Sequence, residues 1–281
     1  MASTRKFPNC GLSLRSVVAI LVIVQVFLYF TWRPHSVCER EVLVYGPLEM
    51  ISPASIGRTR VASDEDGDTS EGKITMRIIL PLFPVQNRYK KFFVEAGALD
   101  GRTISKTLYL EEFYNWTVLL VEPNLHLFHK MTTQGRNAWL APYCLSPKNE
   151  TIHAVMEYPY DPNDPIASWG GGISQKQKVK GAIKKGATIY SALVKCYPLH
   201  MLLDAIDIKT VHFFSLDVEG VELQVLKTLP FHRIDFQVIQ VEHLWNDEGP
   251  EPLKNFLLSL GYTLVEENGS ESIYANMTAL H

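Results

Sequence analysis

The sequence predicts an α/β fold, in which a doubly wound, mostly parallel sheet ends in a C-terminal antiparallel hairpin and is preceded by one transmembrane helix. Three observations lead to this prediction. Between residues 76 and 281, continuous apolar runs alternate with segments of helical periodicity, which is typical of a parallel sheet covered on both faces. The stretch "YTLVEENGSESIYANM" alternates on both sides of Asn268-Gly269, as a hairpin does. Residues 16–32 form an apolar run near the minimum length that crosses a bilayer.

The apolar segment "SVVAILVIVQVFLYFTW" predicts a membrane anchor. Basic residues precede it, so the positive-inside rule places the N-terminus in the cytoplasm. No small-residue cleavage site follows the segment, which favours an uncleaved signal anchor over a cleaved signal peptide. The predicted organisation is a cytoplasmic tail at 1–15, an anchor at 16–32, a proline-containing and acidic lumenal stem at 33–75, and a folded domain at 76–281.

Several residues agree with a lumenal domain. Four N-x-S/T sequons are candidates for glycosylation, at Asn115, Asn149, Asn268 and Asn276. In an oxidising lumen Cys144 and Cys196 are candidates for a disulfide, the alternative being two small buried hydrophobic residues. Cys38 lies beside the membrane, where it is a candidate for linking two copies of the chain. The net charge of -3 argues against nucleic acid as a partner.

The elements of the domain follow one another in a regular order. The runs "KFFVEAG", "TVLLVEPN", "NAWLAPYCLS", "TIHAVMEYP", "VHFFSLDVEG" and "DFQVIQVEH" read as strands, and "ISKTLYLEEF", "LHLFHKM", "PLHMLLDAI", "VELQVLKTL" and "EPLKNFLLSLG" as helices. Residues 170–186 are rich in lysine and glycine. They predict a solvated loop, with a lid that attracts an anionic group as the alternative.

The first strand runs into a turn that contains two glycines. Glu95 and Gly97 end the strand, and Asp100-Gly101 precede the next helix. Glycines there let the backbone turn tightly and approach a ligand, although the complete G-x-G-x-x-G pattern is absent. A plain turn between strand and helix explains the glycines equally well.

The second strand ends in an acidic residue, Glu122, two residues before Asn124. In nucleotide-binding sheets a carboxylate at this place accepts hydrogen bonds from the ribose hydroxyls, about 20 residues after the glycine turn. Together the two strand ends predict a ligand that contains a nucleoside.

Two later strands also end in polar residues. Asp217 and Glu219 follow one strand, and Glu242-His243 end the next. If the strand continues to Glu219, its side chain and that of Asp217 share one face. Such a cluster can position a substrate hydroxyl, remove its proton or hold a cation. For Glu219, capping of the following helix is the alternative role.

These segments resemble the FkbM-type methyltransferases, a Rossmann-like family that uses S-adenosylmethionine. The matching segments are "FVEAGALDG", "TLYLEEFYNWTVLLVEPN", "NAWLAPYCLS", "SLDVEGVELQVLKTL" and "FQVIQVEH". The resemblance implies that Glu95, Gly97 and Gly101, with Asp100, form the cofactor turn, and that Glu122 and Asn124 bind the cofactor. It implies that Asp217 and Glu219 face the methyl group and the substrate; Asp217 is the favoured base, with His243 as the second candidate.

The anchor, the stem and "VEAGALDG…TLYLEE" also resemble Star-like type II membrane proteins of the secretory pathway. That resemblance implies an endoplasmic reticulum, Golgi, endosomal or plasma-membrane protein. Two functions follow as hypotheses: an O-methyltransferase, or a non-catalytic factor that escorts secretory cargo proteins. Arg102 and Lys106 depart from the acidic and amide residues of the family segment, and add two cations beside the predicted site.

Overall fold

The computed structural model describes most of the predicted domain. The described residues are 2–3, 44–45, 72, 77–160, 171–173, 188–246 and 248–280. The predicted anchor at 16–32, most of the stem, Cys38 and the lysines of the 170–186 loop lie outside them. None of the described helices is both long and apolar enough to cross a bilayer.

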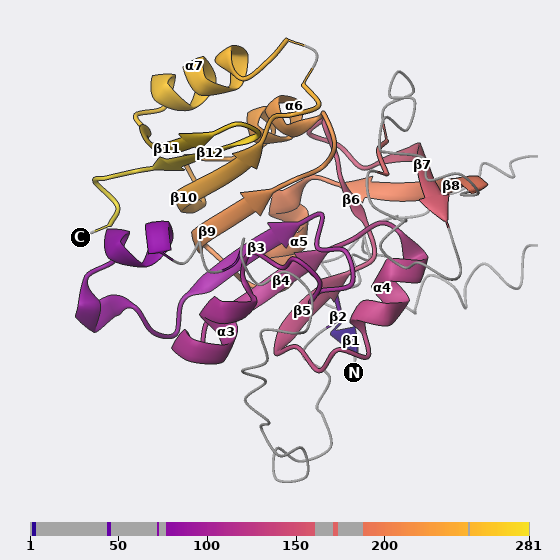
Figure 1. Cartoon of the computed structure of the whole chain (residues 1–281), viewed down its shortest axis with the longest axis horizontal. Helices are drawn as coiled ribbons and strands as arrows, with labels where there is room; N and C mark the ends of the chain where they lie inside the picture. The colour runs from indigo at the N-terminus through magenta and orange to yellow at the C-terminus, as the bar shows by residue number, and fades with distance from the viewer. Residues whose placement is uncertain are drawn as a thin grey trace, which may run out of the picture.

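A mostly parallel sheet forms the centre of the molecule (Figure 1). Its strand order is β1-β2-β5-β4-β3-β9-β10-β12-β11. The parallel strands are β5 (Ala138–Ala141), β4 (Thr117–Val121), β3 (Phe92–Ala96), β9 (Thr210–Leu216) and β10 (Asp235–Glu242). Because they run in one direction, their carboxyl ends meet at one edge of the sheet, where α/β proteins bind ligands. At the far side, β2 (Val44–Tyr45) pairs with β5 and with β1 (Ala2–Ser3).

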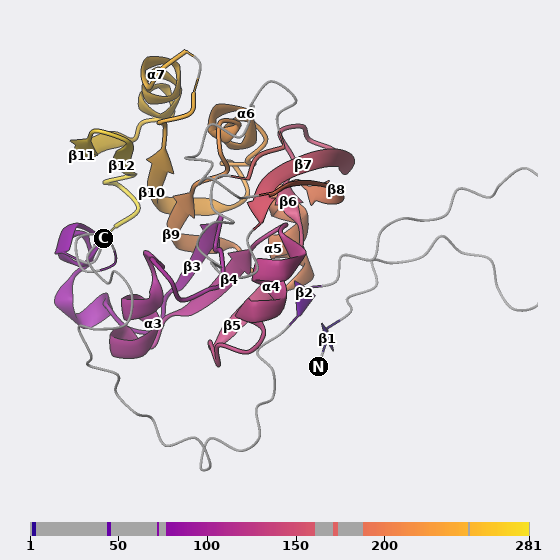
Figure 2. The same ribbon diagram turned by 45° about the vertical axis from the view of Figure 1, so that its right-hand side comes forward.

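Apolar side chains pack on both faces of this sheet, as its continuous apolar strands predict. All five residues of β3 are buried. Two adjacent residues of this strand, Phe93 and Val94, belong to different core clusters because successive side chains of a strand point to opposite faces. The Val94 cluster contains residues of α5 (Leu199–Ala205), α6 (Glu222–Lys227) and α7 (Glu251–Ser259). The Phe93 cluster contains residues of α3 (Leu108–Tyr114), α4 (Leu125–Met131) and the 3-10 helix η1 (Leu80–Leu82), which precedes η2 (Val85–Asn87). Figure 2 shows α3 and α6 on opposite sides of the sheet.

The C-terminal hairpin is present as predicted, and it enters the sheet in an unexpected order. β11 (Thr263–Asn268) pairs antiparallel with β12 (Glu271–Ala275). β12 then lies between β11 and β10, antiparallel to both. The edge strand β11 therefore runs in the same direction as the parallel strands, and the antiparallel strand is second from the edge.

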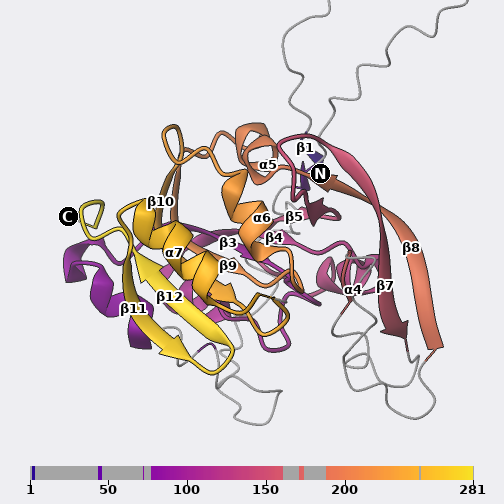
Figure 3. The same ribbon diagram turned by 90° about the horizontal axis from the view of Figure 1, so that it is seen from above.

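A second sheet, with the order β6-β8-β7, stands beside the first (Figure 3). It contains β6 (Cys144–Leu145), β7 (Ile152–Tyr160) and β8 (Thr188–Tyr197). The sequence analysis assigned no strand to β8. Leu193 is 73% exposed although Val194 beside it is buried, so apolar residues lie on both faces and the polarity does not alternate.

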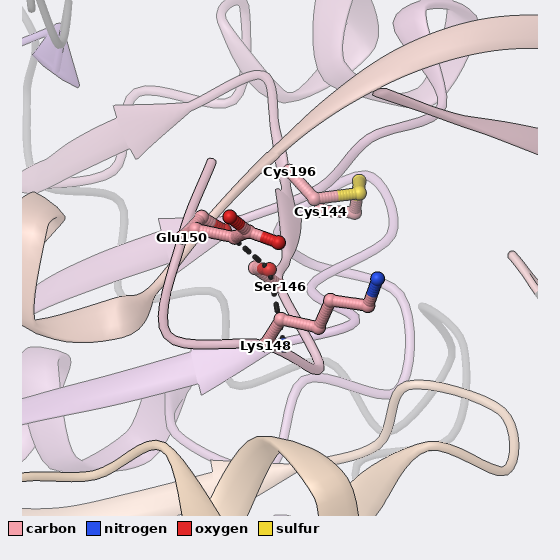
Figure 4. The surroundings of a disulfide bond; sticks show 5 residues. All are labelled: Cys144, Ser146, Lys148, Glu150 and Cys196. Carbon is pink, nitrogen blue, oxygen red and sulfur yellow. Dashed lines mark hydrogen bonds between the residues drawn. A yellow bond between two sulfur atoms is a disulfide. The ribbon is translucent and has the colours of Figure 1, made fainter. Parts of the chain in front are cut away.

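A disulfide holds the second sheet together. Cys144 and Cys196 are register partners in β6 and β8, and their sulfurs are bonded, with the Cα atoms 4.3 Å apart (Figure 4). Beyond β6 the hydroxyl of Ser146 donates to the carbonyl of Glu150 at 2.7 Å and accepts from the amide of Lys148 at 3.2 Å. These bonds order the turn that leads into β7.

Candidate active site

A cavity of about 190 Å³ opens where β3, β4, β9 and β10 end. Six predicted site residues line it: Glu95, Gly97, Glu122, Asn124, Asp217 and Glu219. Three others, Asp100, Gly101 and His243, are not among the lining residues. The four strand ends therefore bring most of the predicted site together.

The glycine turn packs directly on the end of β9. Gly97 has a φ of 83°, which a glycine adopts without strain. A Cβ atom at this position would lie 2.0 Å from the carbonyl oxygen of Asp217. Gly97 therefore lets the end of β3 approach the end of β9, and a side chain at this position would push the two ends apart.

Glu95 holds the loop that follows the glycine turn. Its buried carboxylate accepts hydrogen bonds from the Ser105 hydroxyl at 2.9 Å and the Lys106 amide at 3.0 Å, and also from the Thr107 hydroxyl. Three donors on one carboxylate fix the loop between β3 and α3. Glu95 thus shapes the wall of the cavity in addition to lining it.

Asp100 organises the same loop and does not line the cavity, in contrast to its predicted cofactor contact. Its carboxylate accepts from the amides of Arg102 and Thr103, at 3.0 and 2.7 Å, and its second oxygen pairs with the Lys130 ammonium at 2.6 Å. Burial acts to raise the pKa of Asp100, but Lys130 and the backbone donors outweigh it and leave that pKa below its ordinary value. Gly101, with a φ of 76°, turns the chain beside Met131 and serves the same loop.

Glu122 and Asn124 form the wall at the end of β4. The Glu122 carboxyl accepts from the Leu99 amide at 2.9 Å and the Asn124 amide at 2.8 Å, and its burial raises its pKa to about 8. The Asn124 oxygen caps α4 by accepting from the His126 amide at 3.0 Å. Its Nδ2 is buried and has no hydrogen-bond partner among the described residues. A carboxyl group beside an unsatisfied amide donor fits the hydroxyl groups and acceptor atoms of a nucleoside.

The strand β9 does not continue to Glu219, so the condition for a shared face with Asp217 is not met. The strand ends at Leu216, and Glu219 and Gly220 have φ values of 63° and 102°. Asp217 and Glu219 therefore do not share a strand face, although both line the cavity. A non-glycine residue in the left-handed region is strained, and such strain is concentrated at functional sites.

Glu222, which the sequence analysis left without a role, holds this loop. Its side chain has no exposed surface, and it accepts from the amides of Val218 and Gly220 at 3.0 Å each. Burial raises the pKa of Glu222 to about 7. Glu222 therefore satisfies backbone donors ahead of α6, whose N-cap residue Val221 makes no side-chain capping bond. The spacing of Glu222 from Gly220, within the motif "DVEGVE", is the sequence feature from which this role could have been inferred.

Glu242 completes a group of carboxyl groups at the cavity with Asp217 and Glu219. Burial, followed by the charge of Asp217, raises the pKa of Glu219 to about 8 and that of Glu242 to about 9. Within the described residues no three histidines, cysteines or acids are arranged to ligate a metal. We call these three residues, Asp217, Glu219 and Glu242, the acidic end of the cavity.

Lys106 places a cation beside the acidic end. Its ammonium lies 3.3 Å from the Asp217 carboxylate and also pairs with Glu271 of β12, and its side chain is 7% exposed. Arg102 is directed elsewhere, since it pairs with Glu112 at 3.9 Å and is 35% exposed. Of the two cations that depart from the family segment, Lys106 is the one that lines the cavity.

His243 does not reach the cavity. Its ring Nε2 lies 3.0 Å from the Ser272 hydroxyl, and its backbone amide donates to the Ser270 carbonyl at 2.8 Å. The imidazole thus joins β10 to the hairpin. Its predicted part as a second candidate base has no geometric support.

The remaining wall is apolar and was not predicted as part of the site. It includes Tyr143, Leu145, Met156 and Ile173, from and around the second sheet. Gly171 packs closely there, because a Cβ at this position would lie 2.8 Å from atoms of Met156 and Tyr158. The alternation of apolar Ala154, Met156 and Tyr158 with polar His153 and Glu157 along β7 is the sequence pattern that could have indicated an inward face.

Comparison with known proteins identifies the family of the chain. A family model described as the methyltransferase FkbM domain matches residues 95–264. The chain is similar to the crystal structure of methyltransferase FkbM from Methylobacillus flagellatus KT, with 14% identity and a TM-score of 0.40, over 73% of this chain and 50% of that one. The chain thus spans about half the length of that protein. No curated protein matches it. The family match covers more than half of the sequence, and the chain belongs to the FkbM methyltransferase-domain family.

Proposed function

We propose that the protein binds S-adenosylmethionine in this cavity and methylates an oxygen of a hydroxyl or carboxyl group. The observation that carries the proposal is the end of β4, where the Glu122 carboxyl and the unsatisfied Nδ2 of Asn124 line the same cavity as Asp217. These groups fit the nucleoside part of the cofactor, and the Asp217 carboxylate in the same cavity is a group near which an acceptor can be placed.

The chain's own residues have separate tasks in this proposal. Glu122 and Asn124 hold the nucleoside, and the Gly97 turn leaves the backbone free of a side chain beside the β9 loop. When bound, the cofactor supplies an electrophilic methyl group on a sulfonium. Asp217 orients the acceptor and takes its proton, while Glu222 holds the loop on which Asp217 and Glu219 lie.

Titration of the full chain with S-adenosylmethionine, followed by calorimetry in detergent solution, tests cofactor binding. We expect binding for the unmodified protein and a loss of about tenfold or more for Glu122→Gln, because an amide NH2 replaces one acceptor oxygen and a buried polar group left unsatisfied costs about 1–3 kcal/mol. Glu267→Gln, on the exposed face of β11, is the matched control and should bind as the unmodified chain does. No heat of binding for the unmodified chain would refute the proposal.

We also propose that the domain is lumenal and held by the apolar segment at 16–32. Support comes from the Cys144–Cys196 disulfide, because such bonds persist in oxidising compartments. The pairing of β1 with β2 argues in the other direction, since it brings residues from before and after the segment onto one sheet edge. A spanning helix excludes that pairing, so a topology experiment decides between them.

Glycosylation is such an experiment. Asn115, Asn149 and Asn268 are exposed, whereas Asn276 is half-buried and its oxygen accepts from the Thr278 hydroxyl at 2.7 Å. In secretory cells we expect a glycosidase-sensitive mass shift that falls stepwise when the three exposed asparagines are changed to glutamine. An unglycosylated full chain would contradict a lumenal domain.

Lys106 favours a second candidate function, a non-catalytic recognition module that escorts cargo through the secretory pathway. Its ammonium is paired with Asp217, the residue proposed as the base. A cargo-localisation assay separates the two functions. Asp217→Asn should leave an escort working and should abolish methyl transfer, so loss of cargo transport in that variant would count against the escort.

A further inference from the structure

The acidic end, formed by Asp217, Glu219 and Glu242, contains a buried carboxyl oxygen that has no hydrogen-bond partner among the described residues. Glu242 is 8% exposed and lines the cavity. Its Oε2 has no hydrogen-bond partner anywhere in the described chain. A buried, unsatisfied polar atom costs about 1–3 kcal/mol, so its retention beside a cavity indicates a ligand that satisfies it.

The cation at the acidic end is already engaged. Lys106 pairs with Asp217 at 3.3 Å and with Glu271, and no other lysine or arginine is among the described residues that line the cavity. Mutual repulsion between Asp217, Glu219 and Glu242 adds to their burial in keeping protons on the two glutamates. The acidic end thus has more carboxyl groups than Lys106 balances.

Three kinds of acceptor can be compared against the acidic end. A carboxylate would repel the acidic end, and the ammonium that could attract it is held by two partners. A neutral hydroxyl could satisfy Oε2 and would leave the charges as they are. A protonated amine would donate to Oε2 and allow a glutamate of the acidic end to release its proton, and charged hydrogen bonds are the stronger ones.

We propose that the acidic end, with Glu242 as its specificity-determining residue, binds a protonated amine of the acceptor, and that the methylated oxygen is a hydroxyl of the same molecule. The methylation rests on the proposed function, whereas recognition of the amine does not. The ligand class is an amino alcohol, such as an amino sugar or a hydroxylated amine.

Three probes that share a ring and one hydroxyl test this inference: aminocyclohexanol, cyclohexanediol and hydroxycyclohexanecarboxylate. Each is titrated calorimetrically into the full chain in detergent solution at neutral pH. We expect aminocyclohexanol to bind about tenfold or more tightly than the diol, and the carboxylate to bind weakest. The binding heat of aminocyclohexanol should depend on the ionisation enthalpy of the buffer, because Glu242 or Glu219 releases a proton when the ammonium arrives.

Glu242→Gln removes the group that can ionise when the ammonium arrives and keeps the shape, so it should abolish the preference for the amine. Glu267→Gln, exposed on β11 and paired with Lys254 at 3.0 Å, is the matched control and should keep it. In the unmodified chain, equal binding of the amine and the diol, or no binding of any probe, overturns the proposal. This test does not depend on whether the Glu242 variant folds. A preference that persists in a folded Glu242→Gln variant also overturns it.

A titration with S-adenosylmethionine on the same preparation separates the two proposals. Amine preference without cofactor binding would refute the methyltransferase and support the acidic end as an amine site. Cofactor binding without amine preference would leave the methyltransferase standing and refute the amine site.

Discussion

At the scale of single residues, Gly97 carries the tightest geometric requirement in the site. Its Cα lies so close to the Asp217 carbonyl that even a methyl group would overlap it. The same residue has a positive φ, so a substitution adds backbone strain to the overlap. The two effects can be separated, because another glycine has the strain without the overlap.

That glycine is Gly261, which has a φ of 87° and no atom within 4 Å of the point where a Cβ would lie. We expect Gly261→Ala to cost about 1 kcal/mol of unfolding free energy, from backbone strain alone. Gly97→Ala should cost roughly 2 kcal/mol more and should weaken cofactor binding, because Asp217 must move. Urea unfolding of both variants measures this difference in unfolding free energy. Equal losses would show that the end of β9 moves away from the added methyl group without an energetic cost.

At the scale of elements, the strand ends could be predicted from the sequence better than the loops that follow them. Glu95, Glu122 and Asp217 come directly after continuous apolar runs, and such runs fix where a buried parallel strand lies. The left-handed turn at Glu219 could not be predicted, because it depends on the carboxylate of Glu222 and on Gly220. The contacts of Lys106 and His243 could not be predicted for a related reason. Their partners, Asp217, Glu271 and Ser272, are distant in sequence.

The second sheet shows the same limit. Its outer apolar residues, including Leu193, remove the polarity pattern that predicts a strand. Its contribution to the cavity wall includes Cys144 and Met156, whose partners are likewise distant in sequence. The Cys144–Cys196 disulfide, in turn, holds β8 on β6. This element therefore connects fold stability with the shape of the site.

Removal of that disulfide should be costly. The bond spans 52 residues of sequence, and a loop of this size stabilises the fold by about 3–4 kcal/mol in the chain-entropy account. We expect the double variant Cys144→Ser with Cys196→Ser to lose about this much in urea unfolding, and to bind ligands of the cavity more weakly. The unmodified chain under reducing conditions should behave in the same way. Unchanged ligand affinity would show that β6 and β8 hold the wall without the bond.

At the scale of the whole molecule, the buried carboxyl groups make stability depend on pH. The pKa values of Glu122 and Glu219 are raised to about 8 and that of Glu242 to about 9, mainly by burial. The folded chain therefore holds protons that the unfolded chain has released. This stabilisation is complete below the ordinary glutamate pKa and is lost as the pH rises through the raised values.

We expect the melting temperature of the full chain to fall progressively between about pH 5 and pH 9. Each of the three groups contributes a slope of at most about 1.4 kcal/mol per pH unit. Glu242→Gln should flatten the curve and Glu267→Gln should not, which scanning calorimetry can measure. A melting temperature that stays constant over this range would show that the cavity carboxyls ionise without cost in the folded state.

The position of β12 between β10 and β11 also has a consequence for how the chain is made. A ribosome completes β10 and then β11, and only afterwards releases the strand that joins them. Until β12 emerges, the exposed edge of β10 is open to pairing with the wrong strand, and Lys106 lacks its partner Glu271. The nascent polypeptide therefore cannot finish either its sheet or its acidic end until the residues of β12 have been translated, and both are closed in that one step.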